Sequence, residues 1–469
     1  MGQPPAPRTL AALRASGYRP RSVREELRAN LVARLRAGQP LFEGVLGYDD
    51  SVIPAVEHAL LCGHDLIFLG ERGQAKSRMI RALVSLLDEW LPVVAGSEVH
   101  DDPFAPISKW GKSLVAERSD ATEIAWLPRE ERYVEKLATP DTSIADLIGD
   151  VDPVKVAEGR SLSDELTIHF GLVPRTNRGI FCINELPDLA EKVQVGLFNV
   201  MEERDVQVKG YRVRLPMDVL VVASANPEDY TSRGRIITPL KDRYAAQIRT
   251  HYPRERALEL AIVHQEAALP EADGISLFVP RFMQELVAEL TFQARASPDV
   301  NQASGVSVRM SIANYETLAA AALRRALRAG EREAVPRISD LEALVASTAG
   351  KLELEYAGVE RAESELFRDL VRRATKVVFD ASAPHDELVP VVSAFDEGWK
   401  VEVSSAMPSC EYLAGLDQIQ GLRGAAQQLV GSAAPERLAS AIEFLLEGLH
   451  LSNRLNKTRS ESGGLYARR

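Results

Sequence analysis

The sequence predicts an α/β fold with a parallel sheet at its core, followed by a helical lid and an additional, mostly helical C-terminal region. Three observations lead to this prediction. Short, continuous apolar runs alternate with helical stretches from about residue 38 to 255, as expected of strands covered on both faces. A glycine-rich loop directly follows the first of these runs. Beyond this part of the chain, apolar residues recur at helical spacing.

At 469 residues the chain is long enough to bury two or three hydrophobic cores. The start reads as helical because Leu27, Leu31 and Leu35 recur at helix spacing. The last residues, from about 453, are polar and predicted to be disordered. We therefore expect a helical N-terminal lead-in, an α/β core, a helical lid and a C-terminal region of unknown role with a disordered tail, over residues 1–37, 38–255, 256–350 and 351–469 respectively.

The core strands are predicted from three uninterrupted apolar runs, at residues 65–69, 180–183 and 219–224. Between residues 203 and 218, apolar and polar residues alternate on both sides of Lys209-Gly210, which predicts a β-hairpin. These patterns place three central strands and one hairpin within the α/β core.

The lid and C-terminal region are predicted from helical signals. One helix starts at Pro280, a second follows Ser307, and a third begins at a capping box formed by Ser339 and Glu342. The C-terminal region contains an amphipathic helix around residues 438–449. A strand or two could lie between residues 387 and 403.

Composition excludes some classes of function. The formal net charge of −11 argues against a protein that binds duplex DNA, which normally carries a basic face. No apolar run reaches the roughly 18 residues of a membrane span, and the N-terminus lacks the apolar stretch of a secretory signal. We therefore expect no membrane span and a cytoplasmic location.

The strongest functional signal is the loop after the first strand. It consists of Gly70, Glu71, Arg72, Gly73, Gln74, Ala75, Lys76 and Ser77. This matches the phosphate-binding pattern G-x-x-x-x-G-K-[ST] except that Ala75 replaces the second glycine. In such loops backbone N–H groups surround phosphate oxygens, the lysine reaches the β- and γ-phosphates, and the hydroxyl binds Mg²⁺. The alternative is an ordinary glycine turn, but the order of strand, loop and helix favours a site for ATP and Mg²⁺.

The end of the second strand, Asn184-Glu185, adds to this signal. It resembles the Walker B motif of AAA+ ATPases, with asparagine in place of the usual aspartate. The resemblance implies that Glu185 activates the attacking water and that Asn184 hydrogen-bonds a water on Mg²⁺. The loss of one negative charge beside the ion should weaken Mg²⁺ binding. The alternative, a strand that simply ends in polar residues, would be credible without the phosphate loop upstream.

Three further residues occupy positions that have roles in AAA+ ATPases. Asn226 follows the third strand and matches sensor 1, although Asn-Pro by itself usually marks a turn. Arg243 ends a Leu-Lys-Asp-Arg segment that resembles the arginine-finger region, and would act on ATP bound to a neighbouring subunit. The alternative is an ion pair between Asp242 and Arg243 within one subunit. Arg309 resembles sensor 2 at the start of a lid helix, against the alternative of a surface charge.

Two inserts make the resemblance more specific. Residues 138–159 and 171–179 are similar to magnesium chelatase ATPase subunits, whose helix-2 insert would fall near residues 144–170. The predicted hairpin at 203–218 matches the pre-sensor-1 hairpin of the same group. The resemblance covers roughly residues 40–350 and extends to MoxR-like relatives, in which alanine before the lysine is familiar.

The resemblance implies an ATPase that remodels or activates a protein partner as a homo-oligomeric ring, expected to be a hexamer. The partner could carry a von Willebrand factor A domain. Asn184 keeps open an alternative, a nucleotide-gated scaffold or regulatory subunit that binds ATP but hydrolyses it weakly. A transcription activator that acts through an enhancer would need a GAFTGA-type loop, which the sequence does not contain.

Overall fold

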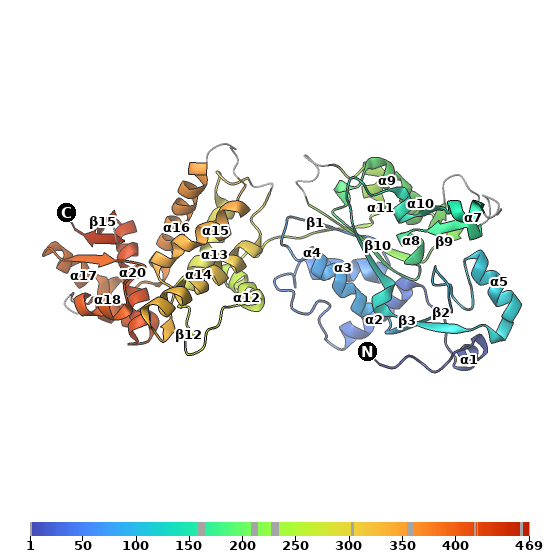
Figure 1. The fold of residues 1–469 in the computed structure, drawn as a ribbon, viewed down its shortest axis with the longest axis horizontal. Coiled ribbons are helices and arrows are strands. Elements are labelled where there is room, and N and C mark those ends of the chain that lie inside the picture. Colours follow the sequence, from blue (N-terminus) through green and yellow to red (C-terminus); the bar gives the residue numbers. More distant parts are fainter. Residues whose placement is uncertain are drawn as a thin grey trace. The chain divides into compact units, whose positions relative to one another are not determined.

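The chain divides into two compact units, Met1–His251 and Tyr252–Arg469, each of which is described by itself (Figure 1). The structure is a computed structural model. It describes residues 2–157, 165–207, 214–226, 234–301, 304–353, 360–416, 419, 421–459 and 463–468.

The first unit is built on a five-stranded sheet in the order β11-β1-β10-β7-β4. All four pairings are parallel, and the register places Ile67 opposite Ala223 and Val222 opposite Cys182. The three strands predicted from the sequence are confirmed as the three central ones. The bounds in sheet order are Ala246–Arg249, Leu66–Leu69, Val219–Ala225, Gly179–Asn184 and Tyr133–Leu137. Because the strands are parallel, all their carboxyl ends lie at one edge of the sheet.

Hydrophobic cores cover both faces of this sheet, which explains the uninterrupted apolar runs. Successive residues of β1 alternate between the two cores: Leu66 and Phe68 pack in one and Ile67 in the other. The first core is closed by helices α2 (Val23–Arg36) and α3 (Val52–Cys62). Helices α9, α10 and α11 contribute to the second, with bounds Glu191–Gly196, Phe198–Glu202 and Thr238–Arg243.

The remaining elements of the first unit are short. The predicted hairpin is present as antiparallel strands β8 (Asp205–Gln207) and β9 (Arg214–Pro216), and its turn lies outside the described residues. The other helices are α1 (Leu10–Ala15), α4 (Lys76–Ala82), α5 (Lys109–Arg118), α6 (Ile144–Leu147), α7 (Pro153–Ala157) and α8 (Leu172–Arg175). The other strands are β2 (Trp90–Val94), β3 (Ile124–Pro128), β5 (Gly149–Val151) and β6 (Ile168–Phe170).

The second unit is mainly helical. Its longer helices are α12 (Arg256–Glu266), α13 (Arg281–Ala296), α14 (Val308–Ala329), α16 (Glu360–Ser382) and α20 (Pro435–Leu451). Shorter ones are α15 (Val345–Thr348), α17 (Leu388–Asp396), α18 (Ser409–Leu416) and α19 (Leu422–Val430). Strands β12 (Ser276–Leu277) and β13 (Glu333–Ala334) pair in parallel, and a three-stranded sheet has the order β14-β16-β15.

One hydrophobic core joins the regions that the sequence suggested as a lid and a separate C-terminal region. The ring of Phe282 on α13 stacks on that of Phe444 on α20 with 4.4 Å between centroids. Helices α16 and α20 approach closely at Gly448, where a Cβ atom would lie 1.9 Å from the Phe379 ring. Residues 256–350 and 351–469 therefore contribute side chains to one continuous hydrophobic core.

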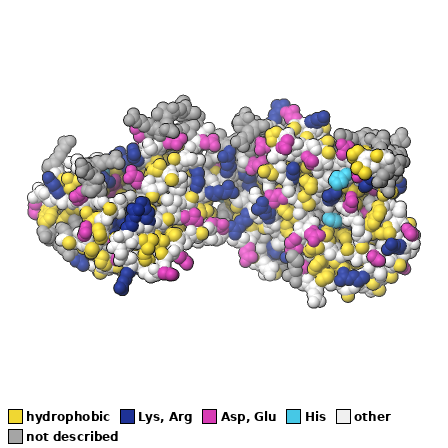
Figure 2. Space-filling view, viewed as in Figure 1, with side chains coloured by type: hydrophobic (Ala, Val, Ile, Leu, Met, Phe, Trp, Pro, Cys, Tyr) yellow, Lys and Arg dark blue, Asp and Glu magenta, His cyan; other side chains and the backbone are white. Residues whose placement is uncertain are grey.

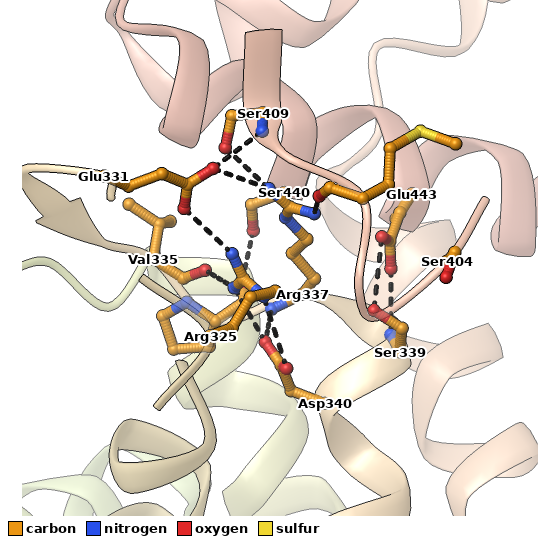
Figure 3. A network of polar contacts seen from close by, with 12 residues as sticks. Arg325, Glu331, Val335, Arg337, Ser339, Asp340, Ser404, Ser409, Ser440 and Glu443 are labelled. Carbon is orange, nitrogen blue, oxygen red and sulfur yellow. Dashed lines mark hydrogen bonds and ion pairs between the residues drawn. The ribbon is translucent and has the colours of Figure 1, made fainter. Parts of the chain in front are cut away.

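A buried polar network reinforces this connection (Figure 3). Arg325 on α14 pairs with Asp340 at 2.9 Å and with Glu331 at 3.3 Å. Arg337 is fully buried and donates to the carbonyl oxygen of Met407 at 2.7 Å and to Ser409 at 2.5 Å. The charges are thus neutralised inside the second unit, as buried charges require.

Two predictions in the second unit were wrong. Residues 338–344 form a 3₁₀-helix that begins after Arg337, with Asp340 as its capping carboxylate. Ser339 does not cap it because its N–H and hydroxyl both donate to Glu443, at 2.8 and 3.2 Å. The capping-box pattern with Glu342 was therefore coincidental.

The polar end of the chain, predicted to be disordered, also forms structure. Asn456–Arg459 (β15) and Gly464–Ala467 (β16) pair with each other, and β16 pairs with Lys400–Val403 (β14). The strand β14 agrees with the expectation of a strand between residues 387 and 403. Tyr466 is buried and its hydroxyl donates to Glu447 on α20, and Lys457 donates to the same carboxylate at 2.7 Å, so side-chain contacts add to the strand pairing that holds this polar segment.

Within the described residues, no helix combines the length and the apolar character that crossing a membrane requires. On the face seen in Figure 2, Lys and Arg side chains are interspersed with Asp and Glu side chains.

Candidate functional site

The loop from Gly70 to Ser77 connects β1 to α4 at the carboxyl edge of the sheet. The N–H of Gly70 donates to the carbonyl oxygen of Ala225 at 3.1 Å, which ties the loop to β10. A Cβ atom on Gly70 would lie 1.9 Å from the Thr250 hydroxyl and 2.3 Å from the Gln74 side-chain oxygen. Only glycine fits there, because Thr250 and Gln74 are themselves hydrogen-bonded at 2.5 Å directly against it.

Two residues of the loop have left-handed backbone conformations. Gly73 has φ of 77° and Ala75 has φ of 57°. Glycine adopts this region freely, whereas a residue with a Cβ atom does so at a cost of about 1–2 kcal/mol. Ala75 thus occupies the backbone conformation that the second glycine of the phosphate-binding pattern would take without strain.

Lys76 is buried at the centre of the loop. Its ammonium group donates to the side-chain oxygen of Asn226 at 2.6 Å, to the carbonyl oxygen of Glu71 at 2.8 Å, and to the carbonyl oxygen of Gly70. Asn226 follows β10, so the loop and the end of a second strand meet at this lysine. A lysine ammonium surrounded by carbonyl oxygens is a fixed positive charge that suits a phosphate group.

Glu185 lies beside Asn226. The side-chain amide of Asn226 donates to the Glu185 carboxylate at 2.7 Å, which links Lys76, Asn226 and Glu185 in one chain of contacts. Glu185 has φ of 54°, a strained conformation for a residue with a side chain, and its N–H donates to the Ser224 hydroxyl at 3.3 Å. Strained backbone conformations of this kind are common at functional sites, where contacts with the surrounding structure stabilise them.

Asn184 ends strand β7 and is nearly buried. Its side-chain oxygen accepts from the Ser224 hydroxyl at 3.1 Å, and its amide donates to the carboxylate of Glu135 on β4. Arg81 also holds Glu135, with Nε and Nη2 each 2.8 Å from one carboxylate oxygen. The hydrogen bonds from Arg81 lower the pKa of Glu135, so this carboxylate is ionised at neutral pH.

Tyr48 contacts the backbone of the loop through its hydroxyl group. Its hydroxyl lies 3.0 Å from the carbonyl oxygen of Gln74 and 2.8 Å from that of His251. The ring of His251 meets that of Tyr48 edge to face, with 5.0 Å between centroids. Burial raises the pKa of Tyr48 to about 12.

The structure brings Lys76, Asn184, Glu185 and Asn226 together but holds Arg243 through other partners. Arg243 ends α11, pairs with Glu202, and donates to the carbonyl oxygen of Pro239 at 2.7 Å. Its guanidinium lies 4.4 Å from the Phe198 ring centroid. Arg243 therefore forms its ion pair within the chain with Glu202, whereas the sequence had suggested Asp242 as the partner. None of these contacts belongs to the phosphate loop.

Arg233 and Arg235, which precede Arg243, are weaker candidates for the arginine finger. Arg235 is exposed and pairs with Glu191 at 3.1 Å, and Arg233 lies outside the described residues. Arg309 is the second residue of α14 in the second unit, where Ser307 accepts from its N–H at 3.1 Å and caps the helix. The role of Arg309 as sensor 2 stays a prediction.

Sequence reasoning missed Glu135, Ser224, Thr250 and Tyr48. Ser224 lies within a run already assigned to a strand, two residues before Asn226. The sequence therefore predicted its position in the strand but not its hydrogen bonds to Asn184 and Glu185. Glu135 belongs to the edge strand Tyr133–Leu137, whose mixed residues give no clear strand pattern. Tyr48 and Thr250 reach the loop only through tertiary contacts.

The oxygen-bearing side chains at this edge fit a Mg²⁺ ion. Mg²⁺ in nucleotide enzymes binds to one or two protein groups and the substrate phosphates, with water completing an octahedron. Asn184 supplies a side-chain oxygen, which accepts from Ser224, and its amide nitrogen donates to the Glu135 carboxylate. Ser77 lies in the first turn of the helix α4. No cluster of three or more His, Cys, Asp or Glu residues that could hold a metal alone occurs in the described part of the chain.

Comparisons with known proteins show which proteins this chain resembles. The family model of the Sigma-54 interaction domain matches residues 163–242, the segment that contains Asn184, Glu185 and Asn226. The magnesium-chelatase subunit ChlI of Anabaena variabilis is 29% identical over 208 residues, which cover 43% of this chain and 57% of that protein. The magnesium-chelatase 38 kDa subunit of Rhodobacter capsulatus is 26% identical over 240 residues, covering 48% and 59%.

Among solved structures, a complex of the magnesium chelatase subunits BchI and BchD contains a chain that is 19% identical to this one. The match covers 74% of this chain and 97% of that chain with a TM-score of 0.33. The chain spans less than two thirds of the length of the two magnesium-chelatase subunits described above. The predicted resemblance to AAA+ ATPases of the magnesium chelatase group is confirmed.

Proposed function

We propose that this magnesium-chelatase-like AAA+ ATPase binds ATP with Mg²⁺ and hydrolyses it to ADP and phosphate. The observation that carries the proposal is the chain of contacts from Lys76 through Asn226 to Glu185. These three residues come from the ends of three different elements and converge on one position at the carboxyl edge of the sheet. A polar group, Asn226, is thus hydrogen-bonded both to a cation for the phosphates and to a carboxylate.

Each of these residues has a chemical role in the proposal. Lys76 binds the β- and γ-phosphates, and the backbone N–H groups of the loop from Gly70 to Ala75 surround them. Ser77 and Asn184 act in the Mg²⁺ site, where the ion neutralises phosphate charge. Glu185 accepts a proton from the attacking water, and Asn226 orients that water.

We further propose that the chain works as a homo-oligomeric ring, expected to be a hexamer, that remodels or activates a protein partner. The similarity to magnesium chelatase subunits supports this proposal, and the resemblance to MoxR-like proteins expected from the sequence agrees with it. Arg243 would complete the catalytic site of the next subunit. A protein that carries a von Willebrand factor A domain is the expected kind of partner.

The proposal is tested by phosphate release from ATP, measured for the parent protein and for Glu185→Gln. We expect the variant to bind ATP with unchanged affinity and to lose most of its turnover, because glutamine cannot accept the proton. Equal turnover in both proteins would refute the role of Glu185. If the parent protein binds ATP but releases almost no phosphate, the second candidate, a nucleotide-gated scaffold, is correct. Asn184 is the observation that favours this second candidate.

A further inference from the structure

The Walker B motif normally carries a carboxylate at position 184, and this chain has an amide there. That amide donates to the carboxylate of Glu135, on the neighbouring parallel strand β4. The register places Glu135 opposite Cys182 and Leu137 opposite Asn184. The Glu135 side chain therefore extends along the strand, towards the carboxyl edge where Asn184 lies.

Glu135 contacts α4, the helix that follows the phosphate loop, through Arg81. Its side chain is 20% exposed, and it accepts from Arg81 of α4 at 2.8 Å through both carboxylate oxygens. The Tyr133 hydroxyl donates to the same carboxylate at 2.9 Å. Arg81 follows Ser77 by four residues, so the two side chains lie on the same face of α4. The pair thus places the carboxylate on the face of α4 that carries the Ser77 hydroxyl.

We propose that Glu135 supplies the negative charge of the Mg²⁺ site that the Walker B aspartate supplies in other AAA+ ATPases, and that Asn184 holds it there. This inference rests on the proposed function, since it concerns the Mg²⁺ that accompanies ATP. In this proposal the carboxylate that other AAA+ ATPases carry at the end of β7 is supplied here by the adjacent strand β4, which accounts for the asparagine at position 184. The competing explanation is that Arg81 and Glu135 form a purely structural ion pair between α4 and β4.

Charge exchange between the two positions separates these explanations. The proteins compared are the parent, Glu135→Gln, the double variant Glu135→Gln/Asn184→Asp, and Arg81→Gln. The double variant has the same net charge as the parent but places the carboxylate on β7. Arg81→Gln breaks the same ion pair and leaves the Glu135 carboxylate in place. Thermal unfolding of each variant reports any loss of the fold.

The readout is ATP binding by calorimetry, first with a chelator and no Mg²⁺, then at increasing Mg²⁺ concentration. For Glu135→Gln we expect unchanged ATP affinity without Mg²⁺ and about a tenfold or greater rise in the half-saturating Mg²⁺ concentration, the usual effect of losing a supporting group at a metal site. The half-saturating Mg²⁺ concentration of the double variant should return to that of the parent protein. That of Arg81→Gln should not exceed the parent value.

An unchanged Mg²⁺ requirement in Glu135→Gln would overturn the inference. So would an equal rise in Glu135→Gln and Arg81→Gln, because the ion pair would then be structural. Failure to bind ATP under either condition in the parent protein would instead overturn the proposed function. The two failures are thus distinguishable within one set of titrations.

Discussion

The ammonium group of Lys76 lies 2.6 Å from the side-chain oxygen of Asn226, although 149 residues separate them in the chain. The contact joins the phosphate loop after β1 to the residue after β10, two neighbouring strands of the sheet. The side-chain amide of Asn226 also donates a hydrogen bond to the Glu185 carboxylate at 2.7 Å. The residue that would sense the γ-phosphate therefore touches both the lysine that would bind it and the carboxylate that would activate water.

The first prediction concerns the strained alanine of the loop. Ala75→Gly should raise the free energy of unfolding by about 1 kcal/mol, because glycine adopts the left-handed conformation of residue 75 without steric cost. The matched control is Ala82→Gly at the end of α4, where φ is −65° and glycine should instead destabilise by about 0.5–1 kcal/mol. Chemical denaturation measures both changes. Equal destabilisation by the two substitutions would contradict the strain at residue 75.

The second prediction uses the pKa of Tyr48, which burial raises to about 12 from an ordinary value near 10. Because the folded protein disfavours the phenolate, the contribution of Tyr48 to stability is complete below about pH 10 and falls as the pH rises towards 12. Tyr48→Phe should cost about 1–2 kcal/mol at pH 8, since Gln74 and His251 lose a buried donor.

The difference in unfolding free energy between parent and Tyr48→Phe should therefore shrink above pH 10. Tyrosines elsewhere titrate equally in both proteins, so they cancel in the difference. Denaturation curves at pH 8, 9, 10 and 11 test this expectation. A difference that stays constant or grows with pH would show that Tyr48 is not protected from ionisation by the fold.

The third prediction concerns Arg243. Arg243→Ala should keep ATP binding and lose turnover by a large factor, since an arginine finger contributes about 10³–10⁵ in rate to related phosphoryl transfer. Glu202→Gln is the matched control because it removes the partner of Arg243 within the chain and leaves the guanidinium. If Arg243 serves only this ion pair, both variants should lose activity and stability to the same extent.

Mixed assemblies test whether Arg243 acts between subunits. Subunits with Lys76→Ala keep Arg243 but lack a working site, whereas subunits with Arg243→Ala have the site but lack the finger. A mixture of the two should regain ATPase activity, because each supplies what the other lacks. If the mixture assembles and stays as inactive as either variant alone, Arg243 does not act on a neighbouring subunit.

The central part of the fold could be predicted from the sequence because its signals are local. β1, β7 and β10 are buried on both faces, so their apolar runs are uninterrupted and their ends are marked by polar residues. Lys76 was predicted from the loop pattern after β1, and Asn184, Glu185 and Asn226 were predicted from the ends of β7 and β10; the structure brings the four together. The parallel arrangement is what turns three positions distant in sequence into one site.

What could not be predicted depends on tertiary contacts. The contact between Glu135 and Asn184 requires the strand order, which places β4 beside β7. Ser339 follows a capping pattern, yet Glu443 from α20 takes its N–H and hydroxyl. The polar tail forms strands because β16 pairs with the distant strand β14 and Tyr466 is buried. In each case a residue far away in sequence decides between two locally reasonable structures.

Calorimetric titration of ATP into the parent protein and into Lys76→Ala tests the central claim most directly, with Lys112→Ala, an exposed lysine of α5, as the control for loss of one charge. Thermal unfolding of each protein confirms that it is folded. We predict that the parent and Lys112→Ala bind ATP with equal affinity and that Lys76→Ala shows no measurable binding. Equal ATP affinity in a folded Lys76→Ala protein would contradict the assignment of the loop from Gly70 to Ser77 as a nucleotide site.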